Sequence, residues 1–133
     1  MNRSLASVAY LAPDYDVAIA FFCETLDFAL VEDKDLGDGK RWVVVAPSRA
    51  AGANLVIAKA ADERQRAAIG EAAGGRVAFF LETDNFFRDY ASFTARGVKF
   101  LEAPRREPYG TVAVFVDAFG VKWDLLQRAE PGT

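Results

Sequence analysis

The sequence of 133 residues contains no histidine. Imidazole is the usual general base near neutral pH and a common neutral ligand of zinc. Its absence excludes every Ser-His or Cys-His nucleophile arrangement and the ordinary nitrogen donor of a zinc site. Any proton transfer must therefore use carboxylates, Tyr, Lys or backbone groups.

Cysteine is nearly absent as well, since Cys23 is the only one in the sequence. No intrachain disulfide is possible, and nothing points to an oxidising compartment. We expect Cys23 to act as a small buried hydrophobe on a helix. The apolar-rich stretch 5–22 is divided by Pro13 and interrupted by Asp14 and Asp16, so it is neither a signal peptide nor a membrane span. These features predict a cytoplasmic protein that does not enter a membrane.

The sequence also lacks an excess of positive charge. Its formal net charge is −3, and Lys and Arg are scattered along the chain rather than gathered on one face. This pattern does not predict a basic surface that would bind nucleic acid. A hydrophobic content of 52%, with eleven Phe, is enough to build a core, so we expect one domain over residues 1–133.

The first half predicts one helix and four strands. A strand over 7–12 ends at Pro13, and Asp14 can cap the helix that follows. Asp27 is placed to end this helix in the left-handed conformation. The helix has an apolar face made of Ile19, Phe22, Cys23 and Leu26. The remaining strands are expected over 28–31, 41–46 and 54–59, with a polar hairpin turn over 33–40.

The second half repeats the first. A strand over 76–81 is followed by a helix that Asp84 can cap and Gly97 can end. Its buried stripe is expected to contain Phe86, Tyr90 and Phe93. Strands over 111–116 and 121–127 complete the copy. The sequence therefore predicts a duplicated βαβββ unit, with module 5–59 and module 75–128 joined by a weakly helical connector, 60–74.

These features resemble a known superfamily. The two βαβββ halves, the helix over 14–22 and the ending from Asp117-Ala118-Phe119-Gly120 to Trp123-Asp124 are similar to the vicinal oxygen chelate proteins. That superfamily includes glyoxalase I, extradiol dioxygenases, fosfomycin-resistance transferases and bleomycin-resistance proteins. The resemblance covers about residues 5–128 and implies an α+β fold of two curved mixed sheets around a cavity. It also implies a homodimer, often with each cavity shared between two chains.

The resemblance implies a metal site, but this sequence matches the ligand positions of that site poorly. In enzymes of the superfamily the ligands are usually His, His and Glu, and the matching positions here are Ser7, Arg76 and Asp124. A fourth ligand of some members falls near 54–56. Asp124 is a good metal donor, but arginine has no available lone pair and stays cationic. We therefore expect no metal and no other cofactor.

The same match suggests what replaces the metal. Because Arg76 and Asp124 match two ligands of one ion, their side chains are expected to converge and to pair in bidentate fashion. The alternative is a register off by one, which would turn one of the two to the other face of its strand.

Several side chains are candidates for lining the cavity. Tyr109 lies between Pro108 and Gly110 in a loop, where no core pattern requires an aromatic residue. The other aromatic candidates, with Trp123, can instead belong to the core. Four charged neighbours of Tyr109 can attract a ligand or remain solvated, namely Glu102, Arg105, Arg106 and Glu107. The predicted ligand-binding set is Ser7, Tyr10, Trp42, Arg76, Phe79, Tyr109, Phe115 and Asp124.

Two function classes follow from the resemblance. The first is a metal-free protein that binds a small amphipathic or aromatic ligand, similar to bleomycin-resistance proteins, and needs no catalytic residue. The second is a lyase or dioxygenase-type enzyme that either has a metal or uses Asp124 or Tyr109 in proton transfer. The absence of histidine favours the first class. Neither class names a ligand or a specific activity.

Overall fold

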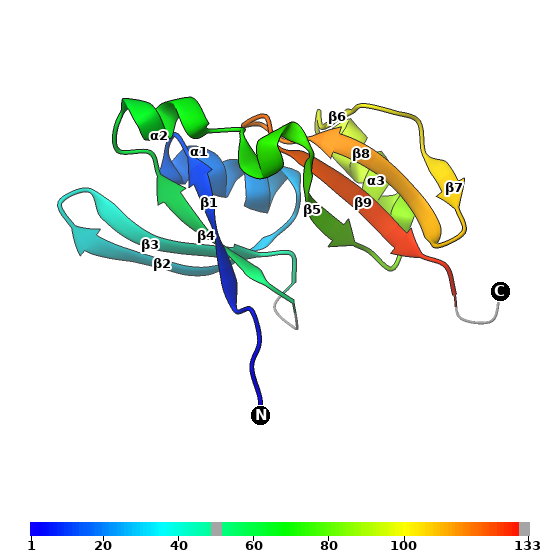
Figure 1. Cartoon of the computed structure of the whole chain (residues 1–133), viewed down its shortest axis with the longest axis horizontal. Helices are drawn as coiled ribbons and strands as arrows, with labels where there is room; N and C mark the ends of the chain where they lie inside the picture. The colour runs from blue at the N-terminus through cyan, green and yellow to red at the C-terminus, as the bar shows by residue number, and fades with distance from the viewer. Residues whose placement is uncertain (49–51, 131–133) are drawn as a thin grey trace. The chain divides into compact units, whose positions relative to one another are not determined.

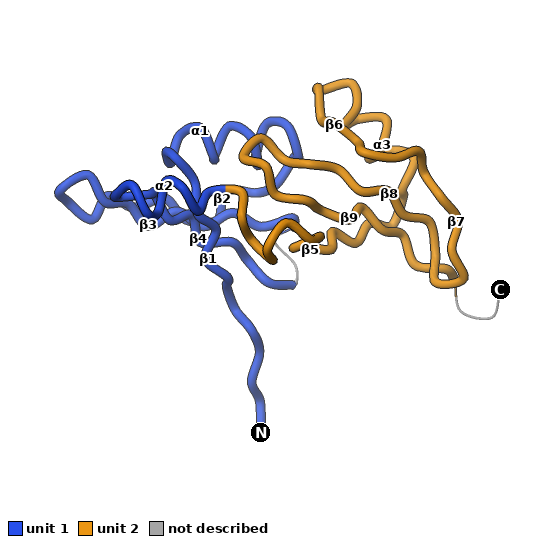
Figure 2. The backbone as a smooth tube through the Cα atoms, turned by 45° about the horizontal axis from the view of Figure 1, so that its top comes forward, with its two compact units in different colours: residues 1–69 blue, residues 70–133 orange. Residues whose placement is uncertain are grey.

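The computed structural model of the chain describes residues 1–48 and 52–130. The chain divides into two compact units, residues 1–69 and residues 70–133, which Figure 2 distinguishes by colour. Each unit contains one mixed β-sheet and one principal helical segment. The predicted repetition of a βαβββ module is therefore confirmed.

The first unit is built on a four-stranded sheet. Its strands, in spatial order, are β1 (Ser7–Ala12), β4 (Asn54–Lys59), β3 (Lys40–Ala46) and β2 (Ala29–Gly37). β1 and β4 are parallel, and the other neighbours are antiparallel. The parallel pair places the two ends of the module side by side (Figure 1).

One helical segment covers a face of this first sheet. Helix α1 (Tyr15–Ile19) begins at Asp14, whose carboxylate accepts hydrogen bonds from the backbone N–H groups of Asp16 and Val17, as predicted. The segment continues as the π-helix η1 (Ala20–Thr25). Asp27 follows with φ of 62°, the left-handed conformation expected of it.

The predicted polar hairpin turn over 33–40 is wrong. β2 continues to Gly37, and Asp33 pairs with Val43 across the ladder to β3. The strand β2 tolerates charged side chains because Asp33 forms an ion pair with the guanidinium of Arg41 at 2.8 Å. The turn itself is confined to Asp38 and Gly39, both of which have positive φ.

The connector forms two short helices, α2 (Glu63–Ala68) and η2 (Ala72–Gly75). The Asp62 carboxylate caps α2 by accepting the backbone N–H of Gln65. Gly70 follows with φ of +87°, and a Cβ there would lie 2.6 Å from the carbonyl oxygen of Phe119. Glycine is therefore required at this position both by conformation and by space.

The second unit repeats the sheet order of the first. The strands run β5 (Val77–Glu82), β9 (Lys122–Arg128), β8 (Gly110–Val116) and β6 (Lys99–Phe100), and β7 (Arg105–Glu107) also pairs with β8. β5 and β9 are parallel. The short strands β6 and β7 were not anticipated from the sequence. They occupy together the edge that β2 occupies in the first unit.

Helix α3 (Phe86–Ala95) belongs to the second unit and contacts β9. Its predicted cap was wrong by one residue, since Asn85 accepts the backbone N–H of Arg88 at 3.2 Å. The Asp84 carboxylate binds the Arg88 guanidinium instead. Gly97 follows the helix with φ of +89°, as expected for a C-terminal glycine.

An aromatic core joins α3 to the second sheet. The ring of Phe93 meets Phe115 edge-on, and Phe115 stacks on Trp123 with centroids 5.9 Å apart. Phe79 lies on the other side of Trp123 at 4.7 Å. Phe86, Phe93 and Phe115 are buried. These contacts identify the face of the sheet that α3 covers.

The helices of the described residues include none long and apolar enough to cross a membrane. The cytoplasmic location stays a prediction from the sequence.

Candidate functional site

The second sheet has an open face opposite α3. Because side chains alternate along a strand, the neighbours of Phe79, Phe115 and Trp123 point away from the aromatic core. These neighbours are Phe80, Val114 and Asp124, which stand side by side in the register of β5, β9 and β8. The open face thus carries an aromatic ring, an aliphatic group and a carboxyl group in one row.

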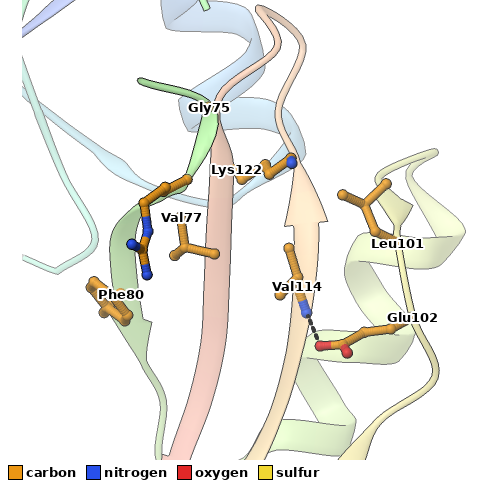
Figure 3. Close-up of a pocket in the computed structure, with 8 residues that line it drawn as sticks. Gly75, Val77, Phe80, Leu101, Glu102, Val114 and Lys122 are labelled. Atoms are coloured by element: carbon orange, nitrogen blue, oxygen red, sulfur yellow. Dashed lines mark hydrogen bonds between the residues drawn. The ribbon is translucent and has the colours of Figure 1, made fainter. Parts of the chain in front are cut away.

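A pocket of about 490 Å³ lies on this face. Figure 3 shows its floor on β5, β9 and β8, with Leu101 and Glu102 along one side. Phe80 is 65% exposed despite its size, so its ring is available for contact. The lining consists of Gly75, Arg76, Val77, Phe80, Leu101, Glu102, Val114 and Lys122.

Asp124 stands beside this pocket in register with Phe80 and Val114. Its Oδ1 atom is buried and has no hydrogen-bond partner. Desolvation raises the pKa of this carboxyl group, the charge of Arg105 opposes the shift, and the charge of Glu102 adds to it. Asp124 therefore keeps its proton to a higher pH than an exposed aspartate does.

Glu102 and Arg105 connect β7 to β8 at the edge of the sheet beside the pocket. The Glu102 carboxylate accepts the backbone N–H of Val114 at 2.9 Å, the bond dashed in Figure 3, in the gap between β6 and β7. Arg105 donates from Nε to Glu102 at 3.1 Å and from Nη1 to Glu107 at 2.9 Å. Its Nη1 also lies 3.4 Å from the hydroxyl of Tyr109. Hydrogen bonds to Glu107, Tyr109 and Glu102 raise the pKa of Arg105, so it remains a cation that ties β7 to its neighbours.

The predicted bidentate pair between Arg76 and Asp124 is wrong. No ion pair joins these two within residues 1–48 and 52–130, and the unpartnered Oδ1 of Asp124 excludes a bidentate contact. The partner of Asp124 on β5 is Phe80, whereas Arg76 precedes Val77 at the start of the strand. Since a strand rises about 3.3 Å per residue, the backbone of Arg76 lies on the order of 10 Å away along β5.

Two of the predicted ligand-binding aromatics lie on the face that α3 covers. Phe79 packs on Trp123, and Phe115 is fully buried between Trp123 and Phe93. The ring on the open face is the adjacent Phe80, which sequence reasoning missed. The register of β5 against β9 shifts between Val77 and Phe79, and a sequence pattern does not show such a bulge.

The first unit contains three of the predicted site residues. Tyr10 is only 2% exposed and meets Phe22 edge-on, so it belongs to the core under η1. Trp42 is partly exposed, and its indole N–H donates to the Glu32 carboxylate at 2.8 Å. Ser7 begins β1 opposite Asn54 and is partly buried.

In the second unit, the structure places Arg76 in the pocket lining, Asp124 beside it, and a half-exposed Tyr109 next to Arg105. Sequence reasoning missed Val77, Phe80, Leu101, Val114 and Lys122. Alternation along β8 and β9 was a usable signal for Val114 and Lys122, because each lies one residue from an aromatic core position.

The donors available for a metal are sparse on this face. Within the part of the chain that the structure describes, no three His, Cys, Asp or Glu side chains are grouped to hold an ion. Beside Asp124, Phe80 and Val114 offer no lone pair, and Arg105 contributes positive charge.

The fold of the chain belongs to a recognised class of protein. Residues 4–125 match the glyoxalase/bleomycin resistance protein/dioxygenase superfamily, and the chain belongs to that superfamily. The α+β fold of duplicated βαβββ modules expected from the resemblance is thereby confirmed.

Three individual proteins are similar to this chain over almost its whole length. An uncharacterized protein of Shewanella frigidimarina (strain NCIMB 400) is 46% identical, over 96% of this chain and 95% of its own. The crystal structure of UcmS2 is 28% identical with a TM-score of 0.81, covering 95% of this chain and 98% of that chain. TnmS3, an antibiotic binding protein from Streptomyces sp. CB03234, is 27% identical with a TM-score of 0.79, covering 96% and 98%.

Proposed function

We propose that this chain binds a small amphipathic or aromatic ligand on the open face of its second sheet, without a metal. One observation carries the proposal: the exposed ring of Phe80 lies in register with Asp124, whose buried Oδ1 has no hydrogen-bond partner. An exposed aromatic ring offers a stacking surface, and an unsatisfied acceptor offers an orienting hydrogen bond. Binding sites typically combine an apolar wall with a few such polar groups.

The relatives support binding as the role. TnmS3 is described as an antibiotic binding protein and aligns with almost the whole of this chain. Its 27% identity extends the likeness beyond the fold.

The absence of a metal is part of the proposal. It is supported by the donor set, since Arg76 and Ser7 match two of the superfamily's ligand positions and the neighbours of Asp124 on the sheet are Phe80 and Val114. A single carboxylate is a poor site for a divalent ion. Metal analysis of protein purified without a chelator tests this part directly, and stoichiometric metal would overturn it.

The binding role is tested with a panel of aromatic antibiotics and small aromatic acids. Thermal shift would identify a ligand, and calorimetry would give its affinity for the wild type and for Phe80→Ala. We expect Phe80→Ala to weaken binding about tenfold or more, because a stacked aromatic contact is lost.

The matched control for that variant is Phe87→Ala, which removes another exposed ring, from α3. It should leave the affinity unchanged. Equal losses in both variants, or no binding of any aromatic compound, would contradict the proposal.

A second candidate is proton transfer by Asp124 in a lyase-like reaction. The observation that favours it is the raised pKa of this carboxyl group together with its unpartnered Oδ1. Turnover of hemithioacetals, lost in Asp124→Asn and unaffected by a chelator, would support it. We also propose a homodimer, as superfamily membership suggests, to be tested by light scattering after gel filtration.

A further inference from the structure

Two cationic residues near the starts of neighbouring strands line the pocket on the second sheet. Lys122 begins β9 and pairs with Val77, and Arg76 is the residue just before Val77. Since β5 and β9 are parallel, both cations stand at the same end of neighbouring strands. Both line the pocket, and Figure 3 shows the Lys122 side chain extending from β9 toward the end of β8.

These two cations differ from four arginines whose charges are paired with carboxylates. Within residues 1–48 and 52–130, Arg76 and Lys122 take part in no ion pair. Carboxylates neutralise the side chains of Arg41, Arg88, Arg105 and Arg128. The charges of Arg76 and Lys122 are therefore available to a ligand.

Glu102, the carboxylate in the pocket lining, is already occupied. It accepts bonds from Arg105 and from the backbone N–H of Val114, so it does not compensate the two cations. The positive end of the pocket and the Glu102–Arg105 pair are thus separate features of the site.

Apolar surface continues from the two cations toward Asp124. Val77, Phe80 and Val114 make this surface, and Leu101 flanks it. Asp124 lies two residues beyond Lys122 on β9, about 7 Å along the strand. This distance suits a ligand body of one or two fused aromatic rings.

We infer that the ligand of this pocket is an aromatic acid, with its anionic group between Arg76 and Lys122 and its ring against Phe80. The inference rests on the proposed binding role and specifies its ligand class. A hydrogen-bond donor at the far end of the ring, such as a hydroxyl group, would lie toward the carboxyl group of Asp124 beside the pocket. Arginine suits a carboxylate through two parallel hydrogen bonds, and lysine adds a point charge.

The test compares two probes of the same shape and different charge, 2-naphthoate and 2-naphthamide. Calorimetric titration of the wild type should show about tenfold tighter binding of the naphthoate, because charge-assisted hydrogen bonds exceed neutral ones. This preference should shrink as salt is raised, since the cations are close to solvent.

Three variants separate the contributions. Arg76→Gln and Lys122→Gln should each remove most of the preference for naphthoate and leave naphthamide binding unchanged. Arg96→Gln removes the same charge at the end of α3 and should change neither affinity. Phe80→Ala should weaken both probes to the same extent.

The outcomes test the ligand class separately from the proposed binding role. Equal affinity for the two probes, or full preference retained in both glutamine variants, would overturn the inference and leave the binding role standing. Failure of both probes to bind would overturn the inference, and failure of every compound in the aromatic panel would overturn the binding role as well. Loss of preference in Arg96→Gln as well would show a general charge effect and would also overturn the inference.

Discussion

Phe80 and Asp124 are direct partners in the register of β5 and β9, and both face away from α3. The pair combines the exposed ring of Phe80 with a carboxyl group whose Oδ1 is buried and unpartnered. A folded chain retains such an unsatisfied group at a cost in stability. For the proposed binding role, the consequence is a site built from neighbouring strands, whose geometry would be fixed before a ligand arrives.

Asp124→Asn should stabilise the protein at neutral pH. Burial raises the pKa of Asp124, so the folded state binds this proton more tightly than the unfolded state does. The native protein then loses stability as pH rises from the unfolded pKa through the folded pKa. The Tm gain of the variant should therefore be larger at pH 7 than at pH 3.

Thermal unfolding of the two proteins across this pH range measures the effect. Asp38→Asn, in the exposed hairpin turn of the first unit, serves as the control and should show no such trend. A Tm difference that grows as the pH falls would contradict the assignment.

Glu102→Ala should destabilise the second unit. It removes the acceptor of the Val114 backbone N–H and one of the partners of Arg105. The loss of a charged hydrogen bond in a part-buried position predicts a cost of about 1–3 kcal/mol in the free energy of unfolding. Urea denaturation would measure it.

Glu102→Gln is the matched comparison, because its amide oxygen can still accept the Val114 N–H. We expect it to cost less than Glu102→Ala. Equal costs would mean that the charge, rather than the hydrogen bond to β8, determines the contribution.

Asp117→Ala should be among the most damaging polar substitutions. Asp117 is 6% exposed, and its carboxylate accepts the backbone N–H groups of Phe119 and Val121 and the indole N–H of Trp123. Removing it deletes three hydrogen bonds, two of them buried, at a cost of about 2–4 kcal/mol. Asp117→Asn keeps one acceptor oxygen and should lose less, as chemical denaturation can show.

Gly110→Ala should disrupt the edge of the second sheet. The new Cβ would lie 2.1 Å from the carbonyl oxygen of Gln127, and φ there is +149°. Gly97→Ala provides the comparison, because φ is also positive and no atom lies within 4 Å of the new Cβ. We expect Gly97→Ala to cost about 1 kcal/mol and Gly110→Ala clearly more. Similar Tm values for the two variants would contradict this steric account.

The sequence predicted local structure well where that structure depends on a few neighbouring residues. Asp14 caps α1, and Asp27 and Gly97 end their helices with positive φ, because capping and chain reversal depend on a few neighbouring residues. The hairpin over 33–40 was mispredicted because cross-strand bonds to Arg41 offset the weak strand propensity of its charged residues.

The sequence did not predict which side chains share a face of the second sheet, because this depends on register. The shift between Val77 and Phe79 decides that Phe80, rather than Phe79, faces the pocket. A change of one residue moves a side chain to the opposite face of a sheet. The same register separates Arg76 from Asp124 and places Arg76 beside Lys122 instead.

The sequence by itself determined the chemistry that is possible and the order of the elements. The absence of histidine, the caps and the repeated βαβββ pattern are properties of residue types and of their spacing along the chain. Only the tertiary structure decided which side chains share the open face of the second sheet. Pairing between β5, β8 and β9 brings residues about 10 to 50 positions apart into one row, and no local pattern encodes that alignment.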